Sequence, residues 1–165
     1  MAGAETPAPE DASPKTYRVM RRPPTVAETR ALYRWAGWTD IPDDDDAVVR
    51  GLAASLFGVV VTLADEVVAC ARLVGDGGMY FYLQDVIVLP AHQGEGVGDL
   101  IMREVVQYLD AHAPADCFVG LFAASGKAGF YERYGFVRRA VDEPGMALQW
   151  EPGLARRLRR PGSAG

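Results

Sequence analysis

The alternation of hydrophobic and polar residues along the chain first predicts a strand over Thr16–Arg22, which two prolines end. Thr25 can then cap a helix that runs to about Ala36, because its side-chain oxygen can accept from the helix N-terminus. A glycine follows this helix and stops it. The chain therefore begins with one strand and one capped helix.

The remaining pattern alternates strands with two longer helical segments. Two apolar runs joined by a short polar turn predict an antiparallel hairpin, and the run after them is the longest strand candidate. The predicted elements are a helix beginning within 43–46, strands over 57–63, 67–75 and 79–89, a helix after residue 98, a strand over 117–123, a short helix over 127–135, and strands over 136–140 and 146–150. The order strand, helix, helix, three strands, helix, strand, helix, two strands predicts an α/β (α+β) fold with a mixed sheet.

Length and composition indicate one soluble globular domain: 165 residues, 49% hydrophobic and 24% charged. We expect a disordered tail over 1–15, a single domain over 16–150 and a flexible tail over 151–165. The net charge of −5 argues against nucleic acid or an anionic membrane as the main partner. The N-terminus lacks the pattern of a signal peptide, so we expect a cytoplasmic protein.

The most informative segment is the loop Gln93–Gly98, which lies between the longest strand and the following helix. Its glycines allow backbone amides to turn inward, and the helix N-terminus adds a positive dipole end, so the loop suits a diphosphate. A Walker loop would continue with Lys and Ser or Thr, whereas Asp99 follows here. A dinucleotide fingerprint would follow the first strand of a βαβ unit, which this loop does not.

The stretch DVIVLPAHQGEGVGDLIM and the downstream motif GFYERYGFVRR resemble the GCN5-related N-acetyltransferase (GNAT) superfamily. The two motifs cover residues 85–138, and the order of elements extends the resemblance over about 16–150. Finer similarity points to arylalkylamine and serotonin N-acetyltransferase-like members. The resemblance implies a mixed, mostly antiparallel central sheet flanked by helices, with acetyl-CoA as cosubstrate.

The resemblance also implies which residues hold acetyl-CoA. The loop amides would bind the pyrophosphate, and the long strand would pair with the pantetheine arm. One departure is that no basic side chain lies within the loop, so Lys127 is the candidate counter-charge. The expected cosubstrate-binding residues are Val86, Ile87, Val88, Gln93, Gly94, Glu95, Gly96, Val97, Gly98 and Lys127.

Acetyl transfer from a thioester to an amine needs a base for the ammonium and an acid for the departing thiolate. Tyr131, in the second motif, is the acid candidate that the resemblance supports, and its alternative interpretation is a core aromatic residue. Asp85 is the base candidate, because a lone carboxylate in a buried strand is costly unless it is paired or functional. A structural hydrogen bond and a water relay remain open for Asp85.

The acceptor pocket is expected to use Trp38, Tyr80 and Tyr82, since aromatic rings favour apolar or cationic amines. Neither histidine has a cysteine partner nearby, and no metal site is expected. The sequence thus predicts an N-acetyltransferase for the primary amine of a small molecule, with arylalkylamines among the candidates. A peptide or protein N-acetyltransferase, a non-catalytic acyl-CoA-binding sensory domain, and a homodimeric state remain open.

Overall fold

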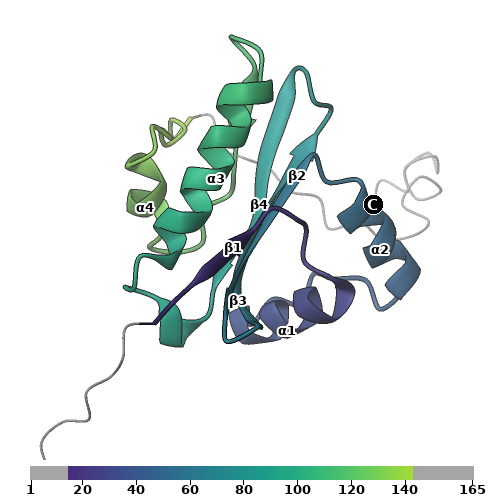
Figure 1. The fold of residues 1–165 in the computed structure, drawn as a ribbon. Helices are drawn as coiled ribbons and strands as arrows, with labels where there is room; N and C mark the ends of the chain where they lie inside the picture. The colour runs from purple at the N-terminus through teal and green to yellow at the C-terminus, as the bar shows by residue number, and fades with distance from the viewer. Residues whose placement is uncertain (1–14, 143–165) are drawn as a thin grey trace, which may run out of the picture. The chain divides into compact units, whose positions relative to one another are not determined.

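The computed structural model describes residues 15–142, which fall into two compact units, one ending at Ala124 and one beginning at Ser125. The first unit is built on a five-stranded sheet in the order β1-β2-β3-β4-β5. All neighbouring strands are antiparallel except β4 and β5, which are parallel. The predicted α/β class with a mixed, mostly antiparallel sheet flanked by helices is confirmed (Figure 1).

The elements of the first unit follow the predicted order, with one short 3-10 helix (η1) inserted after β4. Their bounds are β1 Arg18–Met20, α1 Val26–Ala36, α2 Asp45–Ala53, β2 Phe57–Leu63, β3 Glu66–Gly75, β4 Tyr80–Val88, η1 Pro90–His92, α3 Val97–His112 and β5 Phe118–Gly120.

Helix α1 begins and ends where the sequence predicts. The side chain of Thr25 accepts from the backbone of Glu28, and the Glu28 carboxylate accepts in return from the backbone of Thr25. This capping box satisfies two donors that the helix would otherwise leave unpaired. At the other end Gly37 adopts a left-handed conformation with φ 69°, which glycine reaches without a steric cost. The chain therefore turns sharply into the loop between α1 and α2.

The sheet separates two hydrophobic layers. On one face, Leu32 of α1 packs against Val60, Cys70 and Ile87 of three successive strands. On the other face lies α3, whose core-facing side is fully buried (Figure 1). The buried residues of α3 are Val97, Ile101, Met102 and Val105. Strands β2 and β3 are therefore covered on both faces, by α1 on one and by α3 on the other.

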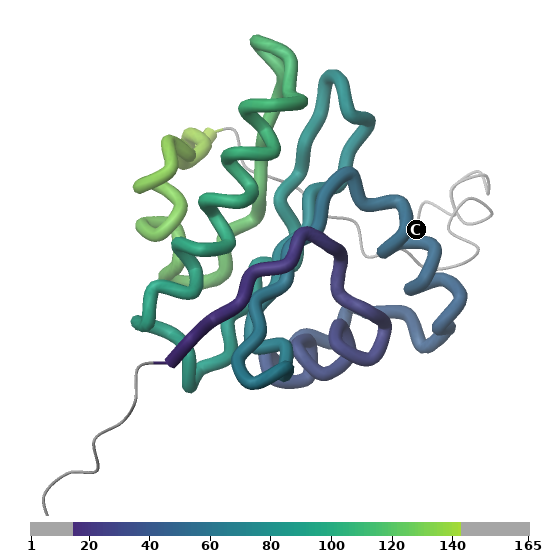
Figure 2. The backbone as a smooth tube through the Cα atoms, viewed as in Figure 1, coloured from purple at the N-terminus to yellow at the C-terminus, as the bar shows by residue number. Residues whose placement is uncertain are grey.

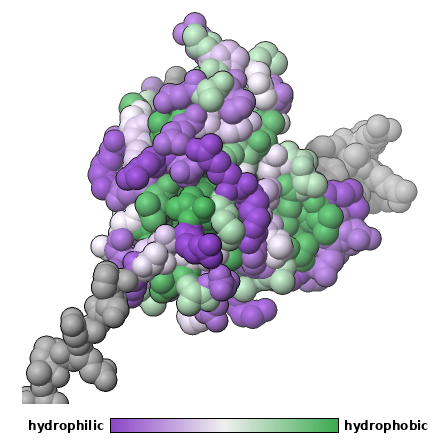
Figure 3. All heavy atoms as spheres, in the orientation of Figure 1, coloured by the Kyte–Doolittle hydropathy of each residue, from purple (hydrophilic) through white to green (hydrophobic). Residues whose placement is uncertain are grey.

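In the view of Figure 3, polar atoms surround two hydrophobic patches, one at the centre of the view and one toward α2, where Val49 is half exposed. Within residues 15–142, no helix is both long enough and apolar enough to span a membrane.

The second unit contains α4, Ala128–Glu132, which is shorter than the predicted helix over 127–135. The predicted strand over 136–140 is wrong: these residues form no strand. A strand exists only with a hydrogen-bonding partner, and its expected partner over 146–150 lies outside the described residues. The tails predicted over 1–15 and 151–165 also lie outside them, apart from Lys15, and the single domain over 16–150 stays a prediction.

Candidate active site

A bulge interrupts strand β4 at its centre. Arg72 pairs with Gln84, and Cys70 pairs with Ile87, so Ala71 of β3 faces two residues of β4 instead of one. The first of those two is Asp85, whose φ of 55° lies in the left-handed region. A β-bulge bends the strand and redirects a side chain, and aspartate tolerates this conformation better than most residues. The bulge therefore gives Asp85 a direction that regular alternation would not.

Strand β5 pairs with only the first part of β4, from Tyr80 to Tyr82. Beyond this point β4 has no second strand neighbour in the described part of the chain, so the edge of Val86–Val88 is free of strand pairing on that side. The side-chain amide of Gln93 donates to the carbonyl of Val88 at 2.9 Å. An open strand edge can accept an extended, amide-containing ligand as an added strand, which is what the pantetheine arm of acetyl-CoA requires.

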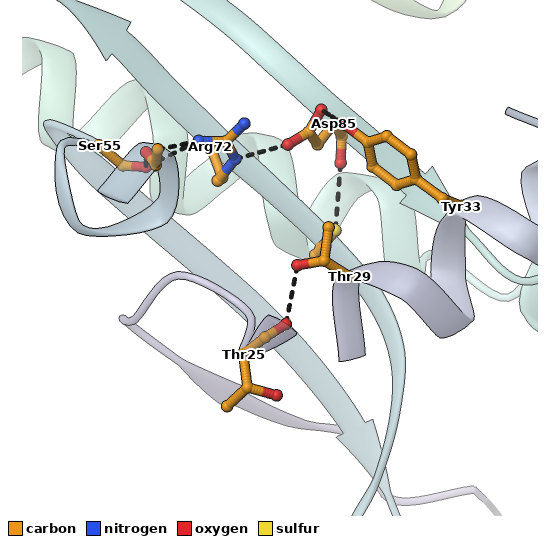
Figure 4. Close-up of polar contacts among 8 residues, drawn as sticks. Thr25, Thr29, Tyr33, Ser55, Arg72 and Asp85 are labelled. Carbon is orange, nitrogen blue, oxygen red and sulfur yellow. Dashed lines mark hydrogen bonds and ion pairs between the residues drawn. The ribbon is translucent and has the colours of Figure 1, made fainter. Parts of the chain in front are cut away.

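The carboxylate of Asp85 is buried, and each of its two oxygens accepts a hydrogen bond. The Tyr33 hydroxyl donates to its Oδ1 at 2.5 Å, and Arg72 Nε donates to its Oδ2 at 2.5 Å. The side chains of Asp85 and Arg72 are only 3% and 15% exposed. Arg72 Nη1 also donates to the carbonyl of Gly51 at 3.2 Å and to Ser55 Oγ at 3.0 Å. Figure 4 shows this chain of contacts, which joins α1, the end of α2, β3 and β4.

Two protonated groups lie next to Asp85. Burial raises the pKa of the Tyr33 phenol, and the hydrogen bond to Asp85 raises it further, so the hydroxyl stays a donor at neutral pH. Burial and the nearby Asp85 charge likewise raise the pKa of the Cys70 thiol, which donates to the Asp85 carbonyl at 3.2 Å. Cys70 is thus a buried thiol held in its neutral form, which is a poor nucleophile.

The predicted acceptor residues fall into two groups. Trp38, in the loop after α1, packs edge-on against Tyr33 with ring centroids 5.4 Å apart, and is 38% exposed. Tyr80 and Tyr82 lie beside β5, and the Tyr82 ring contacts Phe122 at 5.6 Å. The Tyr82 hydroxyl is buried without a hydrogen-bond partner among residues 15–142, and burial raises its pKa. Only Trp38 is shown next to the Asp85 contacts, and the substrate-binding roles of all three stay predictions.

The glycine loop leaves open space at the start of α3. Gly94 and Gly96 both have φ 78°, and a Cβ atom at either position would meet nothing within 4 Å, so the space above the loop is open. Gly96 caps α3 without any side-chain hydrogen bond. The first backbone N–H groups of α3 therefore lack a side-chain cap, and such groups bind anions. This geometry is compatible with a bound diphosphate, and the binding roles of the loop residues stay predictions.

The segment before β1 contacts this loop from a distant part of the sequence (Figure 2). Lys15 Nζ lies 3.1 Å from Glu95 Oε1, and both side chains are about half exposed. Next to them the Tyr17 hydroxyl lies 2.9 Å from His92 Nδ1. Lys15 thus supplies a positive charge that the loop itself lacks. Local sequence gives no signal for it, because the two partners are 80 residues apart.

Tyr131 and Lys127 belong to the second unit, so their expected roles beside the strand and the loop stay predictions. Tyr131 is buried, and its ring lies 5.1 Å from that of Phe130 and 6.1 Å from that of Phe136. Burial raises the pKa of its phenol, which keeps the hydroxyl protonated and able to donate. Within residues 15–142, no three His, Cys, Asp or Glu side chains gather as a metal-ion site would require.

Sequence reasoning singled out Asp85 but missed its partners Tyr33 and Arg72. They are 52 and 13 residues away from it, on a helix and on the adjacent strand. The unfavourable burial of a lone carboxylate was a sign that such partners exist, although it could not identify them.

Comparison with known proteins identifies related sequences and folds. Residues 55–138 match the family model for the acetyltransferase (GNAT) domain. The chain is 34% identical over 81 residues to GCN5-related N-acetyltransferase 1, chloroplastic, of Arabidopsis thaliana, a match over 49% of this chain and 40% of that protein. It is 34% identical over 85 residues to serotonin N-acetyltransferase 2, chloroplastic, of Oryza sativa subsp. japonica, over 52% and 42%. The chain thus spans less than half the length of these two curated relatives.

Among solved structures, a probable acetyltransferase from meticillin-resistant Staphylococcus aureus superposes with a TM-score of 0.75 at 30% identity. The superposition covers 82% of this chain and all of that one. A GNAT family acetyltransferase from Streptococcus pneumoniae gives a TM-score of 0.66 at 26% identity, covering 83% of this chain and 99% of that one.

Proposed function

The chain belongs to the GNAT acetyltransferase family, and from this premise we propose that it transfers the acetyl group of acetyl-CoA directly to the primary amine of a small molecule. Arylalkylamines are the acceptor class we propose first. Acetyl-CoA would supply the acetyl group in activated form, as a thioester. The other roles fall to side chains and backbone groups of this chain.

The single observation that supports an aromatic amine is the contact between Trp38 and Tyr33 beside the bulge of β4. The Trp38 ring is partly exposed, and the Tyr33 hydroxyl beneath it is hydrogen-bonded to Asp85. An exposed indole face can pack on an aromatic ring and attract an ammonium group. The rice relative, whose name assigns it serotonin as a substrate, supports the same class.

The cosubstrate would be held mainly by backbone groups. The uncapped start of α3 and the two left-handed glycines suit the diphosphate, and the open edge of Val86–Val88 suits the pantetheine amides. Backbone donors have fixed directions, so they orient the thioester without first losing side-chain entropy. We propose Lys15 as an additional positive charge at this end of the site.

The reaction requires two proton transfers. Tyr131 would donate a proton to the departing thiolate, and its raised pKa keeps that proton available at neutral pH. Removal of the ammonium proton is assigned to a water relay, because both oxygens of the buried Asp85 carboxylate already accept hydrogen bonds from Tyr33 and Arg72. Asp85→Asn tests whether Asp85 is the base or has a structural role: loss of a base predicts partial rescue at high pH, whereas the structural role predicts the same proportional loss at every pH.

The experiment is a continuous assay of free CoA thiol with acetyl-CoA and a panel of arylalkylamines, aliphatic amines and peptides with free N-termini. We expect turnover that is highest for the arylalkylamines. Trp38→Ala should raise their KM, whereas Trp35→Ala, which removes an exposed indole from α1, is the matched control. Turnover restricted to peptides would replace the small-amine proposal with a peptide N-acetyltransferase. CoA binding without turnover of any amine would favour a sensory domain.

A further inference from the structure

We propose that Tyr33 is a positioning residue that fixes Trp38 relative to strand β4 and thereby sets the selectivity for aromatic acceptors. The inference rests on the proposed function and deepens it. In this proposal Tyr33 acts through Trp38 and not on the reacting atoms.

Tyr33 contacts Trp38 through both its backbone and its ring. The backbone N–H of Trp38 donates to the carbonyl of Tyr33 at 2.9 Å. The two rings pack edge-on at 5.4 Å with an interplanar angle of 83°. The left-handed Gly37 between α1 and Trp38 turns the chain back, which places the indole over the tyrosine. The position of Trp38 therefore depends on where Tyr33 lies.

Tyr33 is in turn held by a rigid anchor. Its hydroxyl donates at 2.5 Å to Asp85, whose carboxylate is buried and also paired with Arg72. Asp85 occupies the bulge of β4, in the strand whose adjacent edge suits the pantetheine arm. Leu32, next to Tyr33 in sequence, is 2% exposed and packs into the same face of the sheet. The Tyr33 hydroxyl is thus a direct polar link between α1, against which Trp38 packs, and the bulge.

This arrangement predicts a selective effect on acceptor binding. Tyr33→Phe keeps the ring but removes the hydrogen bond to Asp85. The phenyl ring, and with it the Trp38 indole that packs on it, can then move to other positions. We expect the KM for an arylalkylamine to rise about five- to ten-fold, within the range of the net contribution of one typical hydrogen bond. The KM for acetyl-CoA should stay near wild type. The value of kcat should also stay near wild type, because the lost interaction weakens acceptor binding equally in the ground state and in the transition state.

The first test compares steady-state kinetics of Tyr33→Phe with those of Tyr108→Phe, which removes a phenol hydroxyl on α3. Trp38→Leu should reproduce the selective rise in KM, and adding Tyr33→Phe to it should cause little further rise, because both changes remove the same contact. Additive effects of the two substitutions would overturn the proposal. So would a fall in kcat with unchanged KM, which would place Tyr33 in the chemical step.

The second test does not need activity. In a background with Trp35 and Trp150 replaced by Phe, Trp38 is the sole indole. Acrylamide quenching of its fluorescence then measures how accessible the Trp38 ring is to the quencher. We expect Tyr33→Phe to increase quenching about two-fold or more, and Tyr108→Phe to leave it unchanged. Equal quenching in Tyr33→Phe and its parent would overturn the proposal. If wild type acetylates no amine, the proposed function fails, and the quenching result alone decides whether Tyr33 positions Trp38.

Discussion

Replacing Arg72 with methionine tests the energetics of the buried ion pair. Methionine fills much of the same volume but leaves the Asp85 carboxylate, only 3% exposed, without its cation. Removing one partner of a buried pair costs about 3–5 kcal/mol, because the remaining charge is uncompensated. The hydrogen bond from Tyr33 remains, so the lower end, about 3 kcal/mol, is the expected loss. That is a large share of the ~5–15 kcal/mol by which a domain of this size is stable.

Urea unfolding at pH 7 measures this loss of unfolding free energy. We expect a lower midpoint urea concentration and an unchanged dependence of the free energy on urea concentration. Arg72→Met with Asp85→Asn should recover at least ~1 kcal/mol over the single variant, because the buried charge is gone and asparagine tolerates the left-handed φ of the bulge. Arg18→Met is the control: its pair with Asp65 is exposed, so stability should change by less than about 0.5 kcal/mol. A loss below about 1 kcal/mol for Arg72→Met would refute the reasoning.

Four further predictions concern the loop, the second unit and pH. Gly96→Val should abolish CoA binding in calorimetry while the protein stays folded, because φ 78° disfavours a β-branched residue and the side chain would fill the open space above the loop; unchanged affinity would contradict the diphosphate site. Lys15→Ala should weaken CoA binding about two- to five-fold at low salt, because it leaves the Glu95 charge uncancelled, and Glu95→Gln in the same chain should restore it. Tyr131→Phe should lower kcat by roughly 100- to 10,000-fold with little change in the KM for acetyl-CoA; wild-type turnover would remove it from the mechanism. Glu28 has a lowered pKa, chiefly through its hydrogen bond from Arg22, so its contribution to stability is complete above about pH 4.3 and is lost as the pH falls through its folded-state pKa; Glu28→Gln should flatten acid unfolding curves in that range.

Local signals in the sequence were sufficient for α1, α2, α3 and the hairpin of β2 and β3, whereas α4 is shorter than predicted. Thr25 and Gly37 define the ends of α1 because capping depends on residues within one turn. The glycine loop was also identified correctly as the turn that opens α3, since its conformation is local.

Features that depend on distant partners could not be predicted in the same way. The bulge at Asp85 appears only when the register of β3 against β4 is known, and Arg72 and Tyr33 become its partners only through the fold. The contact of Lys15 with the loop has the same origin. The strand predicted over 136–140 failed for a related reason, since a β-pattern indicates which residues can pair but does not provide the partner.

The most direct test of the account is to identify the product. Acetyl-CoA carrying an isotopically labelled acetyl group is incubated with an arylalkylamine and the protein, and the amine is analysed by mass spectrometry while free CoA is quantified. We expect an amine heavier by one labelled acetyl group, formed in equal amount to free CoA, and loss of both products with Gly96→Val. Free CoA without labelled amine, or labelled amine formed no faster than without protein, would contradict it.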